Sequence, residues 1–595
     1  MMMKKVMSMV IVITSMAILQ CCSAEDPFSA SDYYDQQMPN ASNGTGSTAT
    51  SSGSSELTKF VVATDLTTAE PTTRADAYFP DAEDDLANNE FGTEVHVVFD
   101  GQTATYDAVS GVSITADGAH VTANHGDTKG VCYVVSGTST AGSLTIVGNK
   151  KYAMKLNNVD LTNPDSAAID LLSKKRAYVL LADGTTNRLA DGSSSKASDQ
   201  KGALYCKGKL LFNGSGQLAV YGNYNNAIHS ADYIVFSPGC NIYVQSTANH
   251  GIKANDGIII NGGILNVEVS AAAAKGINSE ADITINGGRT TVIATGNGTY
   301  EDGEAKGAAA MKCDSTLTMN GGELLLKATG SGGKGLKADW EAYINGGTLR
   351  VITEGGTYTY SRDSASPKGI KVGTKNVHGV LNIFGGDIMV RTSGQGGEGI
   401  ESKGTLAIDG EGTTVAVAAY DDAINSAGDM YLMGGSITAI GTGNDGIDAN
   451  GNMHISGGNI VAFGAGGAES GIDTGEQYKL YITGGCVFGI GGRIDASYAT
   501  TTGAQPYAAT SGSVSANSTV TLTSGTTTLA TFNMPAYAYQ NGTILVSAPG
   551  MTSGSSYTLD LGTQSLTVNA TTTASSSTMG GMSGGRDGGG RPGGW

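Results

Sequence analysis

Charged residues recur along the middle of the 595-residue chain at a spacing that would gather them into two columns. Apolar anchor residues repeat every 23 to 25 positions, apart from gaps of 30 and 34, and polar residues stand at fixed offsets from them. If each repeat is one turn of a stacked structure, equivalent positions lie about 4.8 Å apart. The column directly after the anchors reads Tyr205, His229, Lys253, Asn278, Lys312, Lys337, Lys371, Glu401, Asn425, Asp448 and Asp473. The column two residues before the anchors reads Asn226, His250, Lys275, Ala309, Lys334, Lys368, Glu398, Asp422, Asp445 and Ser470.

The lysine part of these columns has the chemistry of an anion-binding surface. Closely stacked ammonium groups repel one another, and the carboxylates of a polyuronate chain would neutralise them. The alternative is a solvated edge whose charges discourage lateral association. The lysines that we predict to bind ligand are Lys253, Lys275, Lys312, Lys334, Lys337, Lys368 and Lys371.

Two insertions with the sequence Gly-Thr-Tyr stand beside the lysine columns. Residues 295–306 and 353–368 fill the two gaps of 34 and leave the same strand edge two repeats apart. We predict that Tyr300, Tyr358 and Tyr360 stack on sugar rings, because aromatic faces suit the C–H surfaces of pyranoses. The alternative is ordinary loop variation, with these tyrosines packed on the body of the protein.

Both columns change from lysine to carboxylate at the same repeat. Carboxylates stacked this closely raise one another's pKa unless a cation neutralises them. Calcium takes roughly six to eight hard oxygen ligands, so we predict a calcium site, with solvated acidic turns as the alternative. The predicted metal ligands are Glu398, Glu401, Asp422, Asp445, Asp448 and Asp473.

A β-solenoid is the architecture that would hold such columns in place. Each repeat contains short alternating strand patterns and Gly-rich turns, and this combination excludes helical repeats. An Asn-Gly-Gly turn recurs at Asn261, Asn286, Asn320 and Asn345. The spacing predicts an all-β parallel β-helix of about 12 coils. Its inward ladder would consist of Leu204, Ile228, Ile252, Ile277, Met311, Leu336, Ile370, Ile400, Ile424, Ile447 and Ile472, with Ile169 as an earlier anchor.

The N-terminus has the features of a lipoprotein signal peptide. Lys4 and Lys5 precede a short apolar run that ends at Cys21 and Cys22, and Leu19 makes Cys22 the better lipidation site. The acidic residues that follow resemble those that direct lipoproteins to the outer face of some Gram-negative bacteria. We therefore expect an outer membrane lipoprotein exposed at the cell surface, attached to the membrane by its N-terminal lipid. The expected parts are a signal peptide (1–22), a flexible tether and lead-in (23–89), a parallel β-helix (90–495), a C-terminal β segment (496–577) and a Gly-rich disordered tail (578–595).

Composition narrows the function further. A net charge of −19 disfavours non-specific binding of nucleic acid. Beyond the signal peptide, five cysteines remain without any Cys-X-X-Cys pair, and we interpret them as buried small apolar residues.

A family resemblance is carried by residues 109–122, 150–192, the Asn-Gly-Gly coils and the closing stretch near 526–562. These resemble the bacterial carbohydrate-binding-domain-containing proteins, a polysaccharide-lyase-like family with a right-handed β-helix. The resemblance covers about residues 90–565 and is most specific at 150–192. It implies binding of cellulose-like and acidic polysaccharides, with calcium stacked along the helix.

Three functions compete. The first, which we favour, is a surface lipoprotein that binds acidic glycans such as polygalacturonate, and cellulose-like glucans, along a calcium-stabilised β-helix and without catalysis. The second is a calcium-dependent polysaccharide lyase that acts by β-elimination, with Lys337 or Lys371 as the candidate base. The third is a structural adhesin. No compact catalytic constellation stands out in the sequence, so we name no catalytic residue.

Overall fold

The computed structural model describes residues 57, 60–62, 77–196, 199–475 and 477–573. The predicted signal peptide, its Cys22, most of the tether and the Gly-rich tail lie outside these residues. Within the described residues, no helix has the length and apolarity needed to cross a membrane. All five cysteines there are buried and form no disulfide, which confirms their interpretation as small apolar residues.

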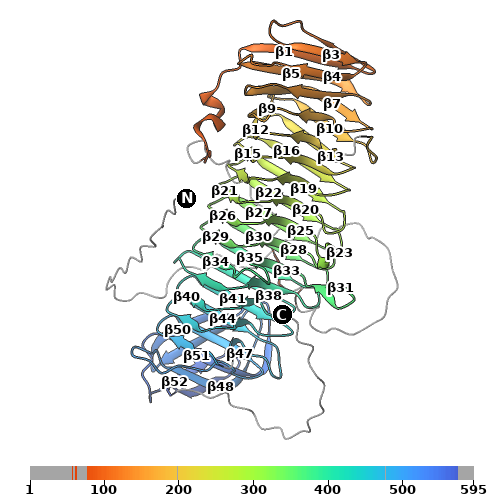
Figure 1. The fold of residues 1–595 in the computed structure, drawn as a ribbon. Coiled ribbons are helices and arrows are strands. Elements are labelled where there is room, and N and C mark those ends of the chain that lie inside the picture. Colours follow the sequence, from red (N-terminus) through yellow and green to blue (C-terminus); the bar gives the residue numbers. More distant parts are fainter. Residues whose placement is uncertain (1–56, 58–59, 63–76, 197–198, 476, 574–595) are drawn as a thin grey trace, which may run out of the picture. The chain divides into compact units, whose positions relative to one another are not determined.

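The repeats form the coils of a parallel β-helix with three ladders of strands, so the predicted all-β solenoid is confirmed (Figure 1). One coil consists of β17 (Ile252–Ala254), β18 (Ile258–Ile260) and β19 (Ile264–Val269). Each strand pairs in parallel with its equivalents in the coils before and after it. Because a strand alternates its side chains between two faces, every ladder has an inward and an outward column at each register position.

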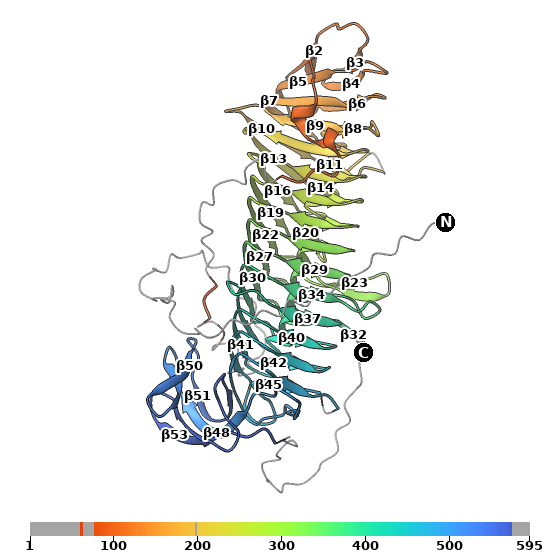
Figure 2. The same ribbon diagram turned by 90° about the vertical axis from the view of Figure 1, so that its left-hand side faces the viewer.

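The ladder that carries the charged columns has fifteen strands in the described residues, and Figure 2 shows several of them stacked along the helix. They are β3 (Ser113–Asp117), β4 (His120–Asn124), β6 (Ser143–Val147), β8 (Ile169–Leu171), β11 (Gly202–Cys206), β14 (Asn226–Ser230), β17, β20 (Lys275–Ser279), β25 (Ala309–Cys313), β28 (Lys334–Ala338), β33 (Lys368–Val372), β36 (Glu398–Ser402), β39 (Ile424–Ser426), β42 (Ile447–Ala449) and β45 (Ile472–Thr474). We call it the first ladder.

The other two ladders close each coil. The second consists of β9 (Ala177–Leu181), β12 (Leu210–Gly214), β15 (Ile234–Phe236), β18, β21 (Ile283–Ile285), β26 (Thr316–Met319), β29 (Glu341–Ile344), β34 (Val380–Ile383), β37 (Thr405–Ile408), β40 (Met430–Leu432), β43 (Met453–Ile455) and β46 (Leu480–Ile482). The third consists of β10 (Thr186–Asp191), β13 (Gln217–Gly222), β16 (Asn241–Ser246), β19, β22 (Arg289–Ala294), β27 (Glu323–Ala328), β30 (Thr348–Thr353), β35 (Asp387–Thr392), β38 (Thr414–Ala419), β41 (Ser436–Gly441), β44 (Asn459–Phe463) and β47 (Cys486–Gly491).

The predicted inward ladder of anchors is confirmed by the register of the strands. Ile252 pairs with Ile277, and Ile400 pairs with Ile424, and all four side chains are fully buried. The remaining anchors follow the same register from Ile169 onward. Burial of these aliphatic side chains contributes about 25 cal/mol per Å² and is the main term that holds the coils together.

The Asn-Gly-Gly turns form a ladder of their own. The side-chain amide of Asn286 donates to Asn261, that of Asn320 to Asn286 and that of Asn345 to Asn320, at 2.8 to 2.9 Å. The second glycine of the turn, Gly263, has a φ of +82°, and a Cβ there would lie 2.4 Å from the carbonyl oxygen of Cys240. The motif is therefore a requirement of coil stacking rather than a binding signature.

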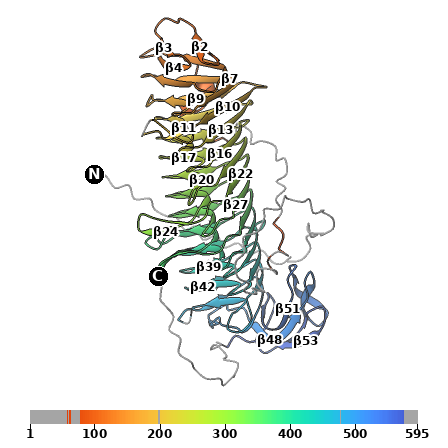
Figure 3. The ribbon, with the colours of Figure 1, turned by 90° about the vertical axis from the view of Figure 1, so that its right-hand side faces the viewer.

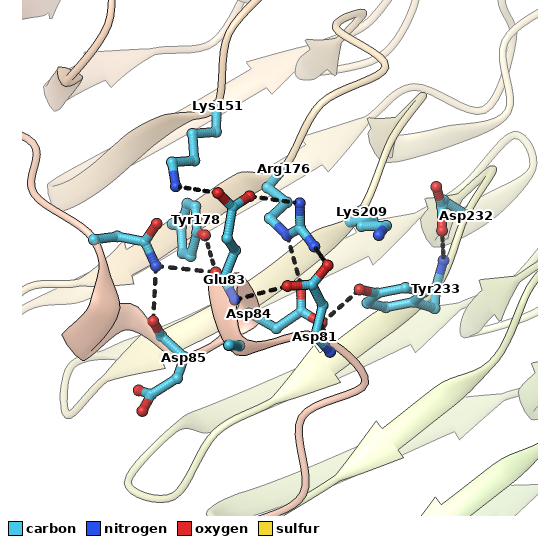
Figure 4. A network of polar contacts seen from close by, with 12 residues as sticks. Asp81, Glu83, Asp84, Asp85, Lys151, Arg176, Tyr178, Lys209, Asp232 and Tyr233 are labelled. Atoms are coloured by element: carbon cyan, nitrogen blue, oxygen red, sulfur yellow. Dashed lines mark hydrogen bonds and ion pairs between the residues drawn. The ribbon is translucent and has the colours of Figure 1, made fainter.

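A buried carboxylate attaches the segment that precedes the first coil to the β-helix. The two short 3-10 helices η2 (Ala82–Asp84) and η3 (Leu86–Asn88) lie against the outward face of the second ladder. Asp84 is fully buried, and it accepts hydrogen bonds from Arg176 at 2.7 Å and from the Tyr233 hydroxyl at 2.5 Å (Figure 4). The first coils are completed by β1 (Thr93–Asp100), β2 (Thr103–Tyr106), β5 (Val131–Ser139) and β7 (Tyr152–Asn163).

The chain after the last coil folds back on the helix. Phe532, Val520 and Leu559 share a buried cluster with Phe463 and Phe488, which point outward from the third ladder. The antiparallel strand β51 also pairs with β47, so the apolar end of the third ladder is covered. The strands of this part are β48 (Tyr507–Val514), β49 (Thr519–Ser524), β50 (Thr527–Asn533), β51 (Tyr539–Ser547), β52 (Ser556–Asp560) and β53 (Ser565–Asn569).

Candidate ligand-binding groove

A groove of about 820 Å³ runs along the outward face of the first ladder. The two predicted columns lie side by side in register, since Lys312 pairs with Lys337 and Lys334 pairs with Lys368 in successive coils. All seven predicted lysines line this groove, so the structure brings them together. They are Lys253, Lys275, Lys312, Lys334, Lys337, Lys368 and Lys371.

The two insertions form antiparallel hairpins that stand beside the groove. They are β23 (Thr299–Glu301) with β24 (Glu304–Lys306), and β31 (Tyr358–Tyr360) with β32 (Asp363–Ala365). The backbone N–H of Ala305 donates to the Asp363 carboxylate at 2.6 Å, which joins the two hairpins although they leave coils two repeats apart. Figure 3 shows β24 standing out from the stack of coils.

The predicted tyrosines lie on these hairpins and differ in exposure. The rings of Tyr300 and Tyr360 stack on each other, with centroids 4.4 Å apart and planes 22° apart. Tyr300 is 41% exposed and Tyr360 is 52% exposed, while Tyr358 is partly buried. Since each exposed ring uses one face against its partner, the opposite face of each remains available for a sugar.

Most of the lysines in the groove already have carboxylate partners. Lys312 forms ion pairs with Asp314 and with Asp339, and Asp339 also lies 2.8 Å from Lys337. Near the start of the groove, Lys253 pairs with Glu280 at 2.7 Å. The surface is therefore a lattice of alternating charges rather than a bare stripe of ammonium groups.

The junction between lysines and carboxylates is a buried ion network. Glu401 is 3% exposed and contacts the ammonium groups of Lys368 at 3.3 Å, Lys371 at 2.9 Å and Lys403 at 2.5 Å. Lys368 also pairs with Glu398 at 2.5 Å. Although burial alone would raise the pKa of Glu401, the three ammonium groups hold that pKa well below its usual range. The three ion pairs therefore strongly favour the ionised form of this carboxylate.

Two lysines differ from the rest. Lys275 and Lys334 donate to the backbone carbonyls of Ala273 and Gly332, and neither has a carboxylate within ion-pair distance among the described residues. Burial, followed by repulsion from neighbouring ammonium groups, lowers the pKa of Lys275 to about 8 and that of Lys334 to about 7. Lys337 and Lys371, which the sequence suggests as bases, are instead held in ion pairs.

The predicted metal ligands beyond the junction lie along the same face. A carboxylate oxygen of Asp422 accepts from the backbone N–H of Asp445 at 3.0 Å, and one of Asp445 accepts from that of Ser470 at 2.6 Å. Burial and repulsion between the carboxylates raise the pKa of Asp422 to about 9, of Asp445 to about 8, of Asp448 to about 7 and of Asp473 to about 6.

The acidic residues offer oxygen ligands that suit calcium, but they are spread along the helix axis. In the part of the chain that the structure describes, no three His, Cys, Asp or Glu side chains converge on one point that could hold a metal ion. Asn425 and Asn450 also donate their amide N–H groups to Asp422 and Asp448, at 3.0 and 2.9 Å. A bound cation would therefore need side-chain rearrangement, and the predicted ligand set stays a prediction.

The carboxylate partners of the lysines are groove residues that the two-column interpretation missed. Glu280, Asp314 and Asp339 stand three positions after their anchors, and Lys403 occupies the same position in the coil of Glu401. This third column is complementary in charge to the column directly after the anchors. The sequence contains this pattern, and comparison of the residues three positions after each anchor would have found it.

Comparisons with known proteins match the part of the chain that contains the groove. The family model described as carbohydrate-binding domain-containing protein matches residues 110–274 and 242–403, which include the groove. The resemblance predicted from the sequence is confirmed. A carbohydrate-binding domain-containing protein of Acetivibrio thermocellus is 28% identical over 157 residues, which are 25% of this chain and 52% of that protein. The chain thus spans about half the length of the curated relative that it matches.

A solved structure was also matched. It is a gadolinium derivative of the polysaccharide lyase-like protein from C. thermocellum, with 21% sequence identity and a TM-score of 0.33. The match covers 49% of this chain and 99% of that chain.

Proposed function

We propose that the protein binds polysaccharides along the groove of the first ladder, and that acidic glycans such as polygalacturonate are its main ligands. The observation that carries this proposal is the continuous row of ammonium groups, one or two from each coil, in the region that matches the carbohydrate-binding family. A polymer with a carboxylate on every sugar would meet several of these groups at once. Each exposed pair contributes only about 0.2–1 kcal/mol, so affinity would grow with chain length.

Neutral glucans such as cellulose are proposed as a second class of ligand at the hairpins. The stacked pair Tyr300 and Tyr360 stands beside the groove and keeps one ring face of each residue open. Stacking on a sugar ring is insensitive to salt, whereas attraction between ions weakens as ionic strength rises. Measurements of binding at low and at high salt therefore distinguish the two modes.

The test is retention on immobilised polygalacturonate at low and high salt. The variant Lys334→Ala/Lys337→Ala/Lys371→Ala should lose most of its retention at low salt. The matched control Lys129→Ala/Lys207→Ala/Lys479→Ala removes the same charge from exposed positions outside the groove and should bind like wild type. Equal loss in both variants would mean that net charge, and not the groove, attracts the glycan.

Calcium is proposed as a ligand of the acidic part of the face. The donors would be the carboxylate oxygens of Asp422, Asp445, Asp448 and Asp473, because Glu398 and Glu401 of the predicted set are already paired with lysines. Hard oxygens are what calcium prefers, and an ion between successive coils would relieve the repulsion that raises the pKa of Asp422. Calcium titrated into chelator-treated protein should give saturable heat in calorimetry, and Asp422→Asn/Asp445→Asn should reduce it.

β-Elimination is a second candidate function, and the environment of Lys334 favours it. In this reaction a base removes the C5 proton of a uronate, the C4–O bond breaks, a C4=C5 double bond forms and the leaving oxygen takes a proton. A lysine with a pKa of about 7 in the groove has the uncharged form that a base needs. The conjugated product absorbs ultraviolet light. Absence of that absorbance after long incubation with polygalacturonate would exclude lyase activity and leave binding intact.

Surface display through a lipid on Cys22 is proposed on the sequence alone. Metabolic labelling with radioactive palmitate should mark the wild-type protein and should not mark Cys22→Ala. Protease treatment of intact cells tests exposure at the outer membrane.

A further inference from the structure

The face of the groove has one gap in its column of long side chains. Ala309 pairs with Lys275 in the coil before it and with Lys334 in the coil after it, so a methyl group stands where its neighbours carry ammonium groups. The strand spacing places these two lysines about 10 Å apart along the helix axis. Ala309 borders the cavity with only 1% of its surface exposed, so a ligand there would meet the side chains around the methyl group; both hairpins contribute residues to these walls, including Lys306 and Ala365.

The two lysines that flank the gap are the two that have only backbone carbonyl partners. An ammonium group has three N–H donors, and Lys275 and Lys334 each use one of them, on Ala273 and on Gly332. The other predicted lysines of the groove are paired with carboxylates of the protein. Among the seven predicted lysines, those without a carboxylate partner thus lie on either side of Ala309.

The charged groups that face the two lysines come from several elements. Around Lys275 they are His250, Glu301, Lys306, Lys312 and Lys337. Around Lys334 they are Lys337, Lys368, Lys371 and Glu401. Positive groups outnumber negative ones on both sides, which makes the space above Ala309 attractive to an anion.

We propose that the space above Ala309, between Lys275 and Lys334, is a subsite for the carboxylate of an acidic sugar, and that a proton is taken up when the carboxylate binds. This deepens and rests on the proposed function, since it names which part of the groove selects uronates. The neighbouring lysines have their charge compensated by carboxylates of the protein. Their role is then to orient the polysaccharide chain along the groove. The free N–H groups of the two ammonium groups donate hydrogen bonds to the carboxylate oxygens.

Proton uptake follows from the lowered pKa values of both lysines. Near pH 8 the two side chains are partly uncharged, and a bound carboxylate favours their charged form. Uronate carboxylates stay ionised between pH 6 and pH 9, so the pH dependence in this range comes from the protein. Affinity should fall at least about tenfold from pH 6 to pH 9, which corresponds to about 1.4 kcal/mol.

The test compares variants by calorimetry with oligogalacturonate of defined length, in two buffers with different ionisation enthalpies. The variant Lys275→Met/Lys334→Met should lose the proton uptake measured near pH 8, and about tenfold or more in affinity measured at pH 6. The variant Ala309→Gln keeps both charges but fills the gap, and register allows the longer side chain because lysines occupy the same position next to it. It should also bind weakly. Melting curves show that each variant is folded.

A matched control removes charge without touching the subsite. Lys150→Met/Asp127→Asn eliminates one exposed ion pair outside the groove and should keep the affinity within about threefold and keep the proton uptake. The methyl ester of the same oligosaccharide has the same backbone without the charges, and it should bind poorly to the wild type.

The outcomes separate the subsite from the function. If Lys275→Met/Lys334→Met binds like wild type, or if its proton uptake persists, the subsite is wrong and groove binding by other lysines stands. The methyl ester binding as tightly as the acid would also overturn the subsite. If the wild type binds neither oligogalacturonate nor polygalacturonate, the proposed function fails and the subsite fails with it.

Discussion

The lysine half and the acidic half of the first ladder share one backbone geometry and solve the same electrostatic problem in opposite ways. In the lysine half, a third column supplies carboxylates such as Asp314 and Asp339 within ion-pair distance. In the acidic half, the partners of Asp422 and Asp445 are backbone N–H groups and an asparagine amide. These donors stabilise single oxygens but do not neutralise the charge. The lysine half is thus balanced by carboxylates of the protein except at Lys275 and Lys334, whereas the acidic half depends on protons or on a cation from solution.

The largest effect is expected where the two halves meet. Glu401→Gln removes the carboxylate that Lys368, Lys371 and Lys403 share and leaves their ammonium groups without a common partner. Breaking a buried pair from one side costs about 3–5 kcal/mol, so the free energy of unfolding should fall by that order. Denaturant unfolding monitored by circular dichroism measures it. A loss below about 1 kcal/mol would show that the junction is solvated, as an exposed ion pair is.

The acidic half should make stability depend on pH when calcium is removed. The pKa values of Asp422, Asp445 and Asp448 are raised to about 9, 8 and 7, so the folded state binds more protons than the unfolded state between pH 4 and pH 9. The free energy of unfolding is therefore highest at the acidic end of this window and falls as pH rises through these values, by about 2 kcal/mol or more. Thermal melting in chelator at pH 5, 7 and 9 measures this fall.

Millimolar calcium should flatten that profile, because it neutralises the same carboxylates and binds the folded state. Asp422→Asn/Asp445→Asn should show a shallower profile without calcium, and the fall that remains should come from Asp448. Melting temperatures at pH 9 that are equal with calcium and with chelator would remove the support for calcium binding in this half.

The two halves also differ in how far the sequence predicts them. The anchors and both columns are predictable because side chains alternate between the two faces of each strand and the repeats have nearly constant length. Together these two regularities fix the register of successive coils, as the pairing of Ile252 with Ile277 shows. Which lysines keep uncompensated charge was not predictable from two columns. That property depends on Glu280, Asp314 and Asp339, which lie at a further offset and act only through distances in space.

The hairpins were predictable in part. The shared Gly-Thr-Tyr sequence and equal insertion length indicate two loops beside the lysines. The stacking of Tyr300 on Tyr360 and the bond from Ala305 to Asp363 depend on contacts between loops two coils apart, and no local pattern encodes them. Likewise, burial of Glu401 under three lysines is a property of the folded face rather than of its own repeat.

An intermediate effect is expected from the aromatic pair. Tyr360→Ala should reduce retention on insoluble cellulose about threefold to tenfold at any salt concentration, since ring stacking contributes about 0.5–1.5 kcal/mol. Tyr478→Ala is the matched control, because that tyrosine is 41% exposed but lies in the acidic half, outside the groove. Equal retention of the two variants would remove the hairpins from the site for neutral glucans.

The smallest effect on stability should come with a gain in binding. Glu280 pairs with Lys253 at 2.7 Å, but its side chain is 45% exposed, so Glu280→Gln should change the free energy of unfolding by less than about 1 kcal/mol. The same change releases the ammonium group of Lys253 at one end of the groove. Retention on polygalacturonate at low salt should rise about twofold to fivefold, an amount that matches one exposed ion pair, and the gain should vanish at high salt.

Glu401→Gln also frees lysines but at a large cost in stability, so the two variants test whether compensation by the protein limits binding. Unchanged retention of a well-folded Glu280→Gln variant would mean that a glycan does not reach Lys253.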